Sequence, residues 1–148
     1  MAAGVQPSLP MARQRRRVQR APFVLVVDDN ADLRELYATY FSSQGLRTAT
    51  AADGVKGLAQ AREDPPDMII ADLSLPHLDG WEMTRRLKRD PRTAHIPVIA
   101  CTGHAYAGSP ERALDAGCDA YVLKPCLPDA LLGEIQRVLA SRSLSRSA

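Results

Sequence analysis

Asp72 is the first residue of this sequence whose position suggests chemistry. It ends the short apolar run Met68–Asp72, and a loop rich in turn-forming residues, Leu73–Gly80, follows directly. The run is typical of a strand that is buried on both faces of a sheet. Asp72 is therefore expected at the carboxyl edge of the sheet, where open α/β sheets bind their ligands. One carboxylate does not define a site, so the polar residues at other strand ends decide what Asp72 can do.

Three other apolar runs also end on polar residues: Phe23–Val27 on Asp28 and Asp29, Pro97–Cys101 on Thr102, and Tyr121–Leu123 on Lys124. Because the carboxyl ends of parallel strands share one edge of the sheet, these side chains are expected to lie together. Three carboxylates, one hydroxyl and one ammonium group would then line a single concave site.

The carboxylates of this group could bind a hard divalent cation such as Mg²⁺, which prefers oxygen ligands and usually keeps several waters. Asp29 and Asp72 are the expected direct ligands. Asp28 would be held through a water or lie near the ion, and a loop carbonyl near Ser74 could be a further ligand. The second oxygen of Asp72 would remain free to attack phosphorus, since aspartyl phosphates are a known product of carboxylate chemistry.

The remaining two polar side chains suit the same reaction. Lys124, together with the metal, would neutralise the charge that gathers on a transferred phosphoryl group, and Thr102 could donate a hydrogen bond to one of its oxygens. No general base is needed, because the attacking carboxylate carries no proton. The residue types therefore predict phosphoryl transfer to Asp72.

The elements between these runs must position the site. Amphipathic or capped segments predict helices in five places: from Leu33 to Phe41, from Asp53 to Pro65 with Val55, Leu58 and Ala59 inward, from about Trp81 to Lys88, from Pro110 to Gly117, and from Pro128 to Leu139. The first of these stripes places Leu33, Leu36, Tyr37, Tyr40 and Phe41 on one helical face. A weaker strand is expected over 46–51. The order is a strand followed by a helix, five times over, which predicts a parallel sheet covered by helices on both faces.

Composition limits the class of protein. A chain of 148 residues, with 45% hydrophobic and 24% charged residues, is typical of one globular domain. The three cysteines, Cys101, Cys118 and Cys126, lack metal-ligand spacing and are expected to be reduced thiols in a cytoplasmic protein. No run is long enough to span a bilayer, and no secretion signal opens the chain, so no membrane partner is expected.

Charge is uneven along the chain. Residues 1–20 hold five arginines and no acid, which leaves 14 basic and 17 acidic residues in the remainder. We expect residues 1–21 to be a disordered basic arm, 22–140 the domain, and 141–148 a polar tail. The arginines of the arm could contact nucleic acid or an acidic membrane, but a solvated leader, or a start at Met11, is the simpler interpretation.

The motifs together resemble the receiver domain of two-component response regulators. The matching segments are Asp28-Asp29, Asp72 within Asp72–Gly80, Thr102 in Ile99–His104, and Lys124-Pro125 in Tyr121–Pro125. The resemblance covers residues 22–140 and implies a flavodoxin-like, five-stranded parallel sheet in the order 2-1-3-4-5. It also implies a cis peptide between Lys124 and Pro125. The family usually has an aromatic residue after this pair, whereas Cys126 stands here.

The resemblance also implies function. Asp72 would accept a phosphoryl group from a histidine kinase or a histidine phosphotransfer protein. Thr102 and Tyr121 would act as a coupled switch, in which the hydroxyl moves toward the phosphoryl group and the ring turns inward. A downstream protein would then bind the surface of the fourth helix, fifth strand and fifth helix, over 105–117 and 121–139. No output domain follows residue 140, so a stand-alone regulator is expected, with nucleic acid an improbable partner.

Two other classes of protein remain open. A receiver-shaped adaptor would bind partners without phosphorylation, but it has no need of the whole set Asp28, Asp29, Asp72, Thr102 and Lys124. A haloacid-dehalogenase-like enzyme also forms an aspartyl phosphate, but it has a second Asp two residues after the nucleophile, where Ser74 stands here. A flavodoxin that binds flavin lacks support, because no phosphate-binding loop follows the first strand.

Overall fold

A computed structural model describes residues 20–103 and 110–147 of the chain. Strands and helices alternate in the order β1 (Phe23–Val27), α2 (Ala31–Ser43), β2 (Arg47–Ala51), α3 (Gly54–Glu63), β3 (Met68–Asp72), α4 (Gly80–Arg89), β4 (Val98–Thr102), α5 (Pro110–Ala116), β5 (Ala120–Leu123) and α6 (Pro128–Ser147). The strands form one sheet in the order β2-β1-β3-β4-β5, and each neighbouring pair is parallel. The predicted flavodoxin-like topology is therefore confirmed.

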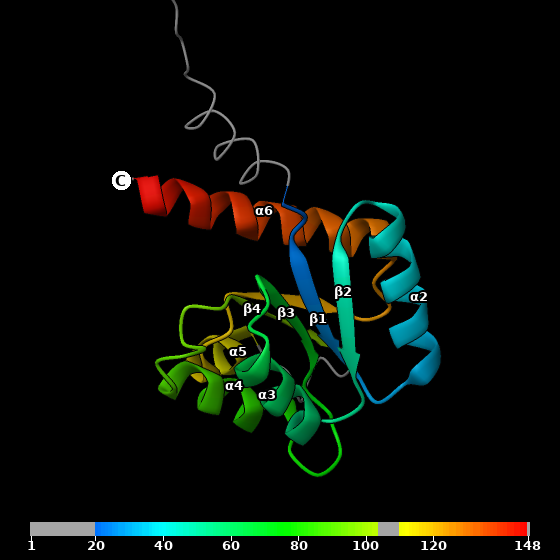
Figure 1. The fold of residues 1–148 in the computed structure, drawn as a ribbon. Coiled ribbons are helices and arrows are strands. Elements are labelled where there is room, and N and C mark those ends of the chain that lie inside the picture. The colour runs from blue at the N-terminus through cyan, green and yellow to red at the C-terminus, as the bar shows by residue number, and fades with distance from the viewer. Residues whose placement is uncertain (1–19, 104–109, 148) are drawn as a thin grey trace, which may run out of the picture.

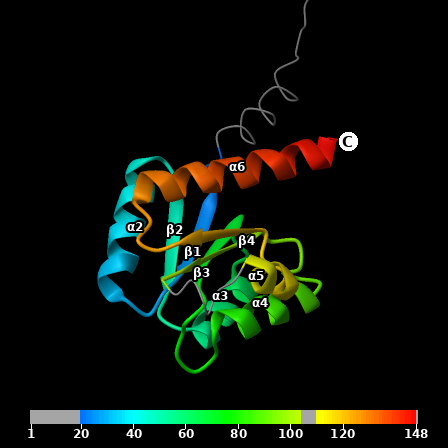
Figure 2. The same ribbon diagram turned by 180° about the vertical axis from the view of Figure 1, so that it is seen from behind.

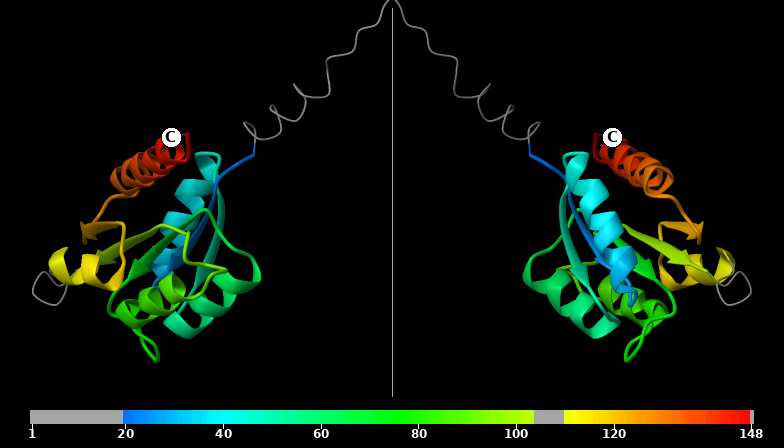
Figure 3. Two further views of the ribbon diagram at one scale, coloured as in Figure 1. Left: turned by 90° about the vertical axis from the view of Figure 1, so that its left-hand side faces the viewer. Right: turned by 90° about the vertical axis from the view of Figure 1, so that its right-hand side faces the viewer.

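Helices cover both faces of the sheet, as the buried strands require. Helices α2 and α6 lie on one face, and α3, α4 and α5 lie on the other (Figures 1 and 2). The side views show the sheet between these two layers (Figure 3). All five residues of β1 and all five of β3 are buried, which is typical of central strands in a doubly covered sheet.

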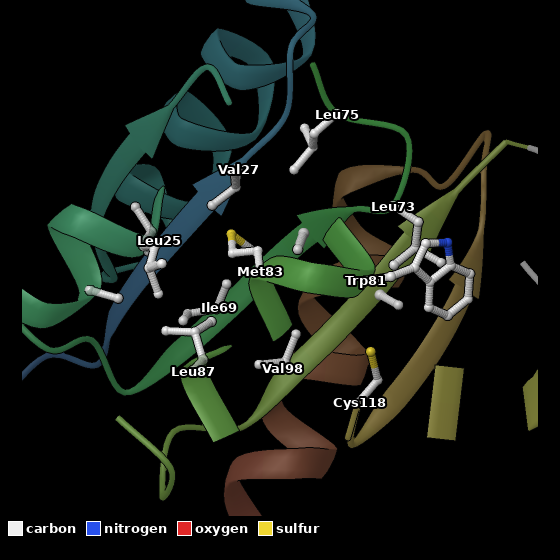
Figure 4. Packing of buried hydrophobic residues seen from close by; sticks show 14 of the residues in the cluster. Leu25, Val27, Ile69, Leu73, Leu75, Trp81, Met83, Leu87, Val98 and Cys118 are labelled. Atoms are coloured by element: carbon white, nitrogen blue, oxygen red, sulfur yellow. The ribbon is translucent and has the colours of Figure 1, made fainter. Parts of the chain in front are cut away.

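Alternate strand residues divide the core into two hydrophobic clusters. Val24 and Val26 of β1 point toward Tyr37 and Phe41 of α2 and the apolar residues of α6. Leu25, Val27 and Ile69 belong to the cluster under α3 and α4, together with Met83, Leu87 and Val98 (Figure 4). Because successive side chains of a strand point to opposite faces of the sheet, the position of a residue in its strand decides which helix layer it contacts.

Side-chain caps begin the three helices that follow the first three strands. Asn30, Asp53 and Asp79 each accept a hydrogen bond from the backbone amide three residues later, at 3.1, 2.8 and 2.8 Å. Such caps satisfy amides that have no partner inside the helix. Asp79 and Gly80, expected at the end of the loop Leu73–Gly80, are the cap and the first residue of α4. Gly45, with φ of +90°, follows the end of α2, in a conformation that favours glycine after a helix.

Two predicted helix faces are partly wrong. Val55 is 55% exposed and Ala59 is also exposed, whereas the buried face of α3 consists of Gly54, Gly57, Leu58 and Ala61. On α2, Leu36 is 49% exposed, although it falls on the predicted apolar stripe. The glycines explain the first error: a Cβ at Gly57 would lie 2.9 Å from Val27, so α3 packs on β1 through residues without side chains.

The last helix extends further than predicted. Helix α6 continues to Ser147, through most of the segment 141–148 that was expected to be a polar tail. Arg142 in this extension donates to the carbonyl of His95 and lies 3.8 Å from a carboxylate oxygen of Asp119. Residues 1–19 of the predicted basic arm lie outside the described residues. No helix in the described part of the chain is long and apolar enough to cross a membrane.

Candidate functional site

The carboxyl ends of β1, β3 and β5 bring three predicted site residues into direct contact. The ammonium group of Lys124 donates to a carboxylate oxygen of Asp28 at 2.6 Å and to one of Asp72 at 3.0 Å. All three side chains are largely buried, with Asp28 and Asp72 only 3% and 8% exposed. Burial opposes the charged form of Lys124, but its hydrogen bonds to Asp28 and Asp72 raise its pKa above the ordinary value. The site therefore keeps a lysine cation at neutral pH.

Asp28 is held on every polar atom. Its amide donates to the carbonyl of Ala51 at 3.1 Å, and its carbonyl accepts from the guanidinium of Arg34 at 2.7 Å. One carboxylate oxygen accepts from the amide of Asn30 at 2.9 Å, and the other accepts from Lys124. This residue is consequently fixed before any ligand arrives.

Asp29 completes an acidic group that could hold a metal. One carboxylate oxygen from each of Asp28, Asp29 and Asp72 lies within 4.8 Å of the others. Asp29 is exposed, and within the described part of the chain no hydrogen bond of its side chain is seen. Oxygen donors with one open side suit Mg²⁺, which binds one or two carboxylates and retains waters. The residues present therefore fit the predicted cation.

The loop after Asp72 is packed closely against the site. The amide of Ser74 donates to a carboxylate oxygen of Asp72 at 2.9 Å, and the amide of Gly80 donates to the carbonyl of Leu73 at 3.1 Å. A Cβ at Gly80 would lie 2.2 Å from the carbonyl oxygen of Asp72. The start of α4 thus touches the backbone of the expected phosphoacceptor. The role of the Ser74 carbonyl as a ligand stays a prediction.

The predicted switch residues lie on the two strands at one side of the sheet. Thr102 ends β4 and is paired in register with Leu123, while Tyr121 is paired with Ala100. Tyr121 is half-buried against the cluster under α3 and α4, and its buried hydroxyl has no hydrogen-bond partner among the described residues. The side chain of Thr102 lies outside the described part of the structure, as do residues 104–109 of the expected docking face.

Next to Lys124 lies an apolar groove that the sequence did not predict. It has a volume of about 470 Å³ and is lined by Leu33, Leu36, Tyr37, Gly103 and Lys124–Pro128. Leu127 on its rim is 69% exposed, and Cys126 occupies the position where an aromatic residue was expected. The hydroxyl of Tyr37 donates to the carbonyl of Cys126 at 2.9 Å, and burial raises the pKa of this tyrosine to about 12. The peptide bond between Lys124 and Pro125 is cis, as the resemblance implied.

Arg34 is the site residue that sequence reasoning missed. It falls outside the apolar stripe of α2, so nothing in the hydrophobic pattern singles it out. Its position near the start of the helix that follows β1 was the available signal. A side chain in the first turn of a helix points back toward the N-terminus and can reach the preceding strand end.

Comparisons with known proteins identify the family to which the sequence is similar. Residues 24–136 match the family model of the response regulator receiver domain. The chain is 40% identical over 102 residues to the polar-differentiation response regulator DivK of Brucella anthropi, covering 69% of this chain and 83% of that protein.

Solved structures of receiver domains share the fold of this chain. The chemotaxis response regulator CheY4 of Vibrio cholerae aligns with a TM-score of 0.76 and 28% identity, over 80% of this chain and 99% of that one. The receiver domain of the sensor histidine kinase PA1611 from Pseudomonas aeruginosa aligns with a TM-score of 0.70 and 32% identity, over 81% and 95% of the two chains. In that structure a magnesium ion is coordinated in the active-site cleft.

Proposed function

This chain belongs to the response regulator receiver domain family of two-component signalling, and from that premise we propose that it accepts a phosphoryl group on Asp72. The donor is a histidine kinase or a histidine phosphotransfer protein. The observation that carries the proposal is the pair of hydrogen bonds from Lys124 to Asp28 and Asp72, beside the open carboxylate of Asp29. An adaptor that is never phosphorylated has no need of this arrangement.

The residues of the site suit each part of the transfer. A carboxylate oxygen of Asp72 forms the new bond to phosphorus while the bond from phosphorus to the donor nitrogen breaks, and the electron pair remains on the imidazole. Lys124 stays cationic and stabilises the negative charge on the phosphoryl oxygens. Thr102 donates a hydrogen bond to one of these oxygens. The chain assists its own phosphorylation and dephosphorylation but has no separate substrate.

Four groups would hold Mg²⁺ here: Asp28, Asp29, Asp72 and the backbone carbonyl of Ser74. When bound, the ion would neutralise charge on the phosphoryl group and orient it. Asp28 is already fixed by four hydrogen bonds, so its contribution is a preformed negative charge. Asp29 is free to contact the ion directly.

The test of this function is the intact mass of the protein after incubation with acetyl phosphate and Mg²⁺. We expect one phosphoryl group to be added, to be labile in alkali, and to be absent when Mg²⁺ is removed with a chelator. A protein that gains no mass under these conditions would favour the adaptor. Continuous release of inorganic phosphate from many phosphate esters would instead favour a dehalogenase-like phosphatase.

Replacing Asp29 with Ala is expected to weaken Mg²⁺ binding by at least about tenfold, because the change removes a charged ligand of the ion. Isothermal titration calorimetry measures the affinity, with Trp81 fluorescence as a second signal. The exposed Asp129, whose carboxylate accepts a hydrogen bond from the amide of Ala130, provides the control Asp129→Asn. Equal affinities in Asp29→Ala and the parent would rule out the ligand role.

The groove beside Lys124 is a suitable place for the phosphodonor to dock. A donor histidine must come within bonding distance of Asp72, so the surface that receives the donor must border the site. The groove does so through Lys124 and Gly103, and its remaining lining is almost wholly apolar. An apolar helix face of the donor is the expected occupant.

We place the protein in the cytoplasm, where its three free thiols remain reduced.

Phosphorylation is expected to change the face made by α5, β5 and α6, to which a downstream protein would bind. A new charge-assisted hydrogen bond from Thr102 would vacate space that the Tyr121 ring can fill. One such bond contributes about 1.5–3 kcal/mol, which shifts a two-state equilibrium by roughly tenfold to a hundredfold. Leu114 and Leu123 are already exposed on this face, at 63% and 50%.

Replacing Thr102 with Ala is therefore expected to preserve phosphorylation but to weaken this response. Backbone NMR spectra of the parent and Thr102→Ala, each with and without beryllofluoride on Asp72, compare the two proteins. In the parent, amide signals of α5, β5 and α6 should shift. If they shift equally in Thr102→Ala, the coupling between Thr102 and Tyr121 is wrong.

A further inference from the structure

We propose that Arg34 is a positioning residue for Asp29 and that it tightens Mg²⁺ binding although it is itself a cation. This inference rests on the proposed function, because it assigns a role to Arg34 at the same site. The geometry that supports it is the hydrogen bond of 2.7 Å from the Arg34 guanidinium to the backbone carbonyl of Asp28.

That hydrogen bond acts on the peptide that joins Asp28 to Asp29. A peptide unit is planar, so fixing the carbonyl of Asp28 also fixes the direction of the Asp29 amide and the position of its Cα. The neighbours on both sides are anchored as well. The backbone amide of Asn30 donates a hydrogen bond to the carboxylate of Asp28. The carbonyl of Asn30 accepts a hydrogen bond from the backbone amide of Arg34 at 3.0 Å. Asp29 is thus oriented through its backbone, while its exposed carboxylate stays available to a cation.

A contribution to helix stability does not explain Arg34 equally well. The residue lies in the first turn of α2, where the helix dipole favours anions and disfavours cations. Within the described residues, its guanidinium forms no ion pair with a carboxylate. Instead, the charged guanidinium donates to a backbone carbonyl at the end of β1, next to the residues proposed to hold the metal.

Electrostatics and positioning predict opposite effects of removing Arg34. A cation close to a metal site repels the metal, so its loss by charge alone should tighten Mg²⁺ binding. Loss of a group that orients a metal ligand should instead weaken Mg²⁺ binding. Such contacts to the ligands typically contribute tenfold to a hundredfold in metal affinity. The sign of the change in affinity therefore separates the two explanations.

The experiment measures Mg²⁺ affinity by calorimetry for the parent, Arg34→Met and Arg34→Lys. Methionine retains the length and apolar stem but removes both the charge and the donors, whereas lysine retains the charge and one donor group. We expect about tenfold weaker binding in Arg34→Met and partial recovery in Arg34→Lys. The matched control is Arg137→Met, which removes one charge from α6 and breaks only a contact with Glu134.

The outcomes distinguish this inference from the proposed function. If Arg34→Met binds Mg²⁺ as tightly as the parent or more tightly, the positioning role is overturned, while phosphorylation of Asp72 still stands on its own test. If the parent binds no Mg²⁺, the proposed metal site itself fails. Urea unfolding of Arg34→Met and backbone NMR shifts of Asp29 and Asn30 accompany the titration. A change confined to the segment 28–30, with unfolding like that of the parent, supports local positioning over general loss of stability.

Discussion

Replacing Asp72 with Asn is expected to abolish the phosphoryl adduct completely. The amide is nearly the same size as the carboxylate, so the variant should fold, but an amide oxygen is a poor nucleophile toward phosphorus. Intact mass after incubation with acetyl phosphate and Mg²⁺ is the measurement. Asp72→Asn should keep the unmodified mass at times when the parent is largely converted.

A matched control separates loss of the acceptor from loss of the fold. Asp129→Asn makes the same chemical change at an exposed position in the first turn of α6, and this variant should be phosphorylated like the parent. Circular dichroism of both variants checks the fold. If Asp72→Asn still acquires one phosphoryl group, then another residue is the acceptor and the assignment of Asp72 fails.

Replacing Gly54 with Ala is expected to destabilise the protein by about 3 kcal/mol, the upper part of the range for overpacking a core. Its Cβ would lie 2.0 Å from the carbonyl oxygen of Leu78, a backbone atom that moves only if the loop after β3 moves. Urea denaturation of the parent and Gly54→Ala measures the free energy of unfolding.

Gly133 provides the opposite case on α6. A Cβ there would have no atom within 4 Å, and the position is exposed inside a helix. Gly133→Ala should therefore stabilise the protein by roughly 1 kcal/mol, because alanine has the higher helix propensity.

Unfolding of Gly54→Ala at the same urea concentration as the parent would mean that the loop after β3 moves easily to accommodate the added methyl group and does not constrain the site.

The sheet and most of the site could be predicted because each strand is short, apolar and closed by a polar residue. Asp28, Asp72 and Lys124 end three such strands, and parallel topology alone brings them to one edge. The proposed reaction follows from the types of these residues. The distances between these side chains could not be predicted from the sequence, because the approach of Lys124 to both carboxylates depends on how the strands are packed.

The errors arise from contacts that a hydrophobic pattern does not reveal. Helix α3 packs through Gly54 and Gly57, so Val55 turns to solvent although it is the more apolar residue. The contact from Arg34 to a backbone carbonyl, likewise, leaves no mark on periodicity. The extension of α6 is held by Arg142 against His95 and Asp119, far apart in the sequence, and a local polar composition gives no sign of it.

The division of the core by the sheet has an evolutionary consequence. One layer of apolar side chains serves α2 and α6, and the other serves α3, α4 and α5, while Asp72 stands at the edge that both layers share. Substitutions in α2 need not be compensated under α4 or α5, because those helices pack in the other layer. Substitutions in α6 differ, because α6 packs in the same layer as α2. Ancestral copies of such a chain could therefore have changed the surface of α5 without repacking α2, with Asp72 unchanged.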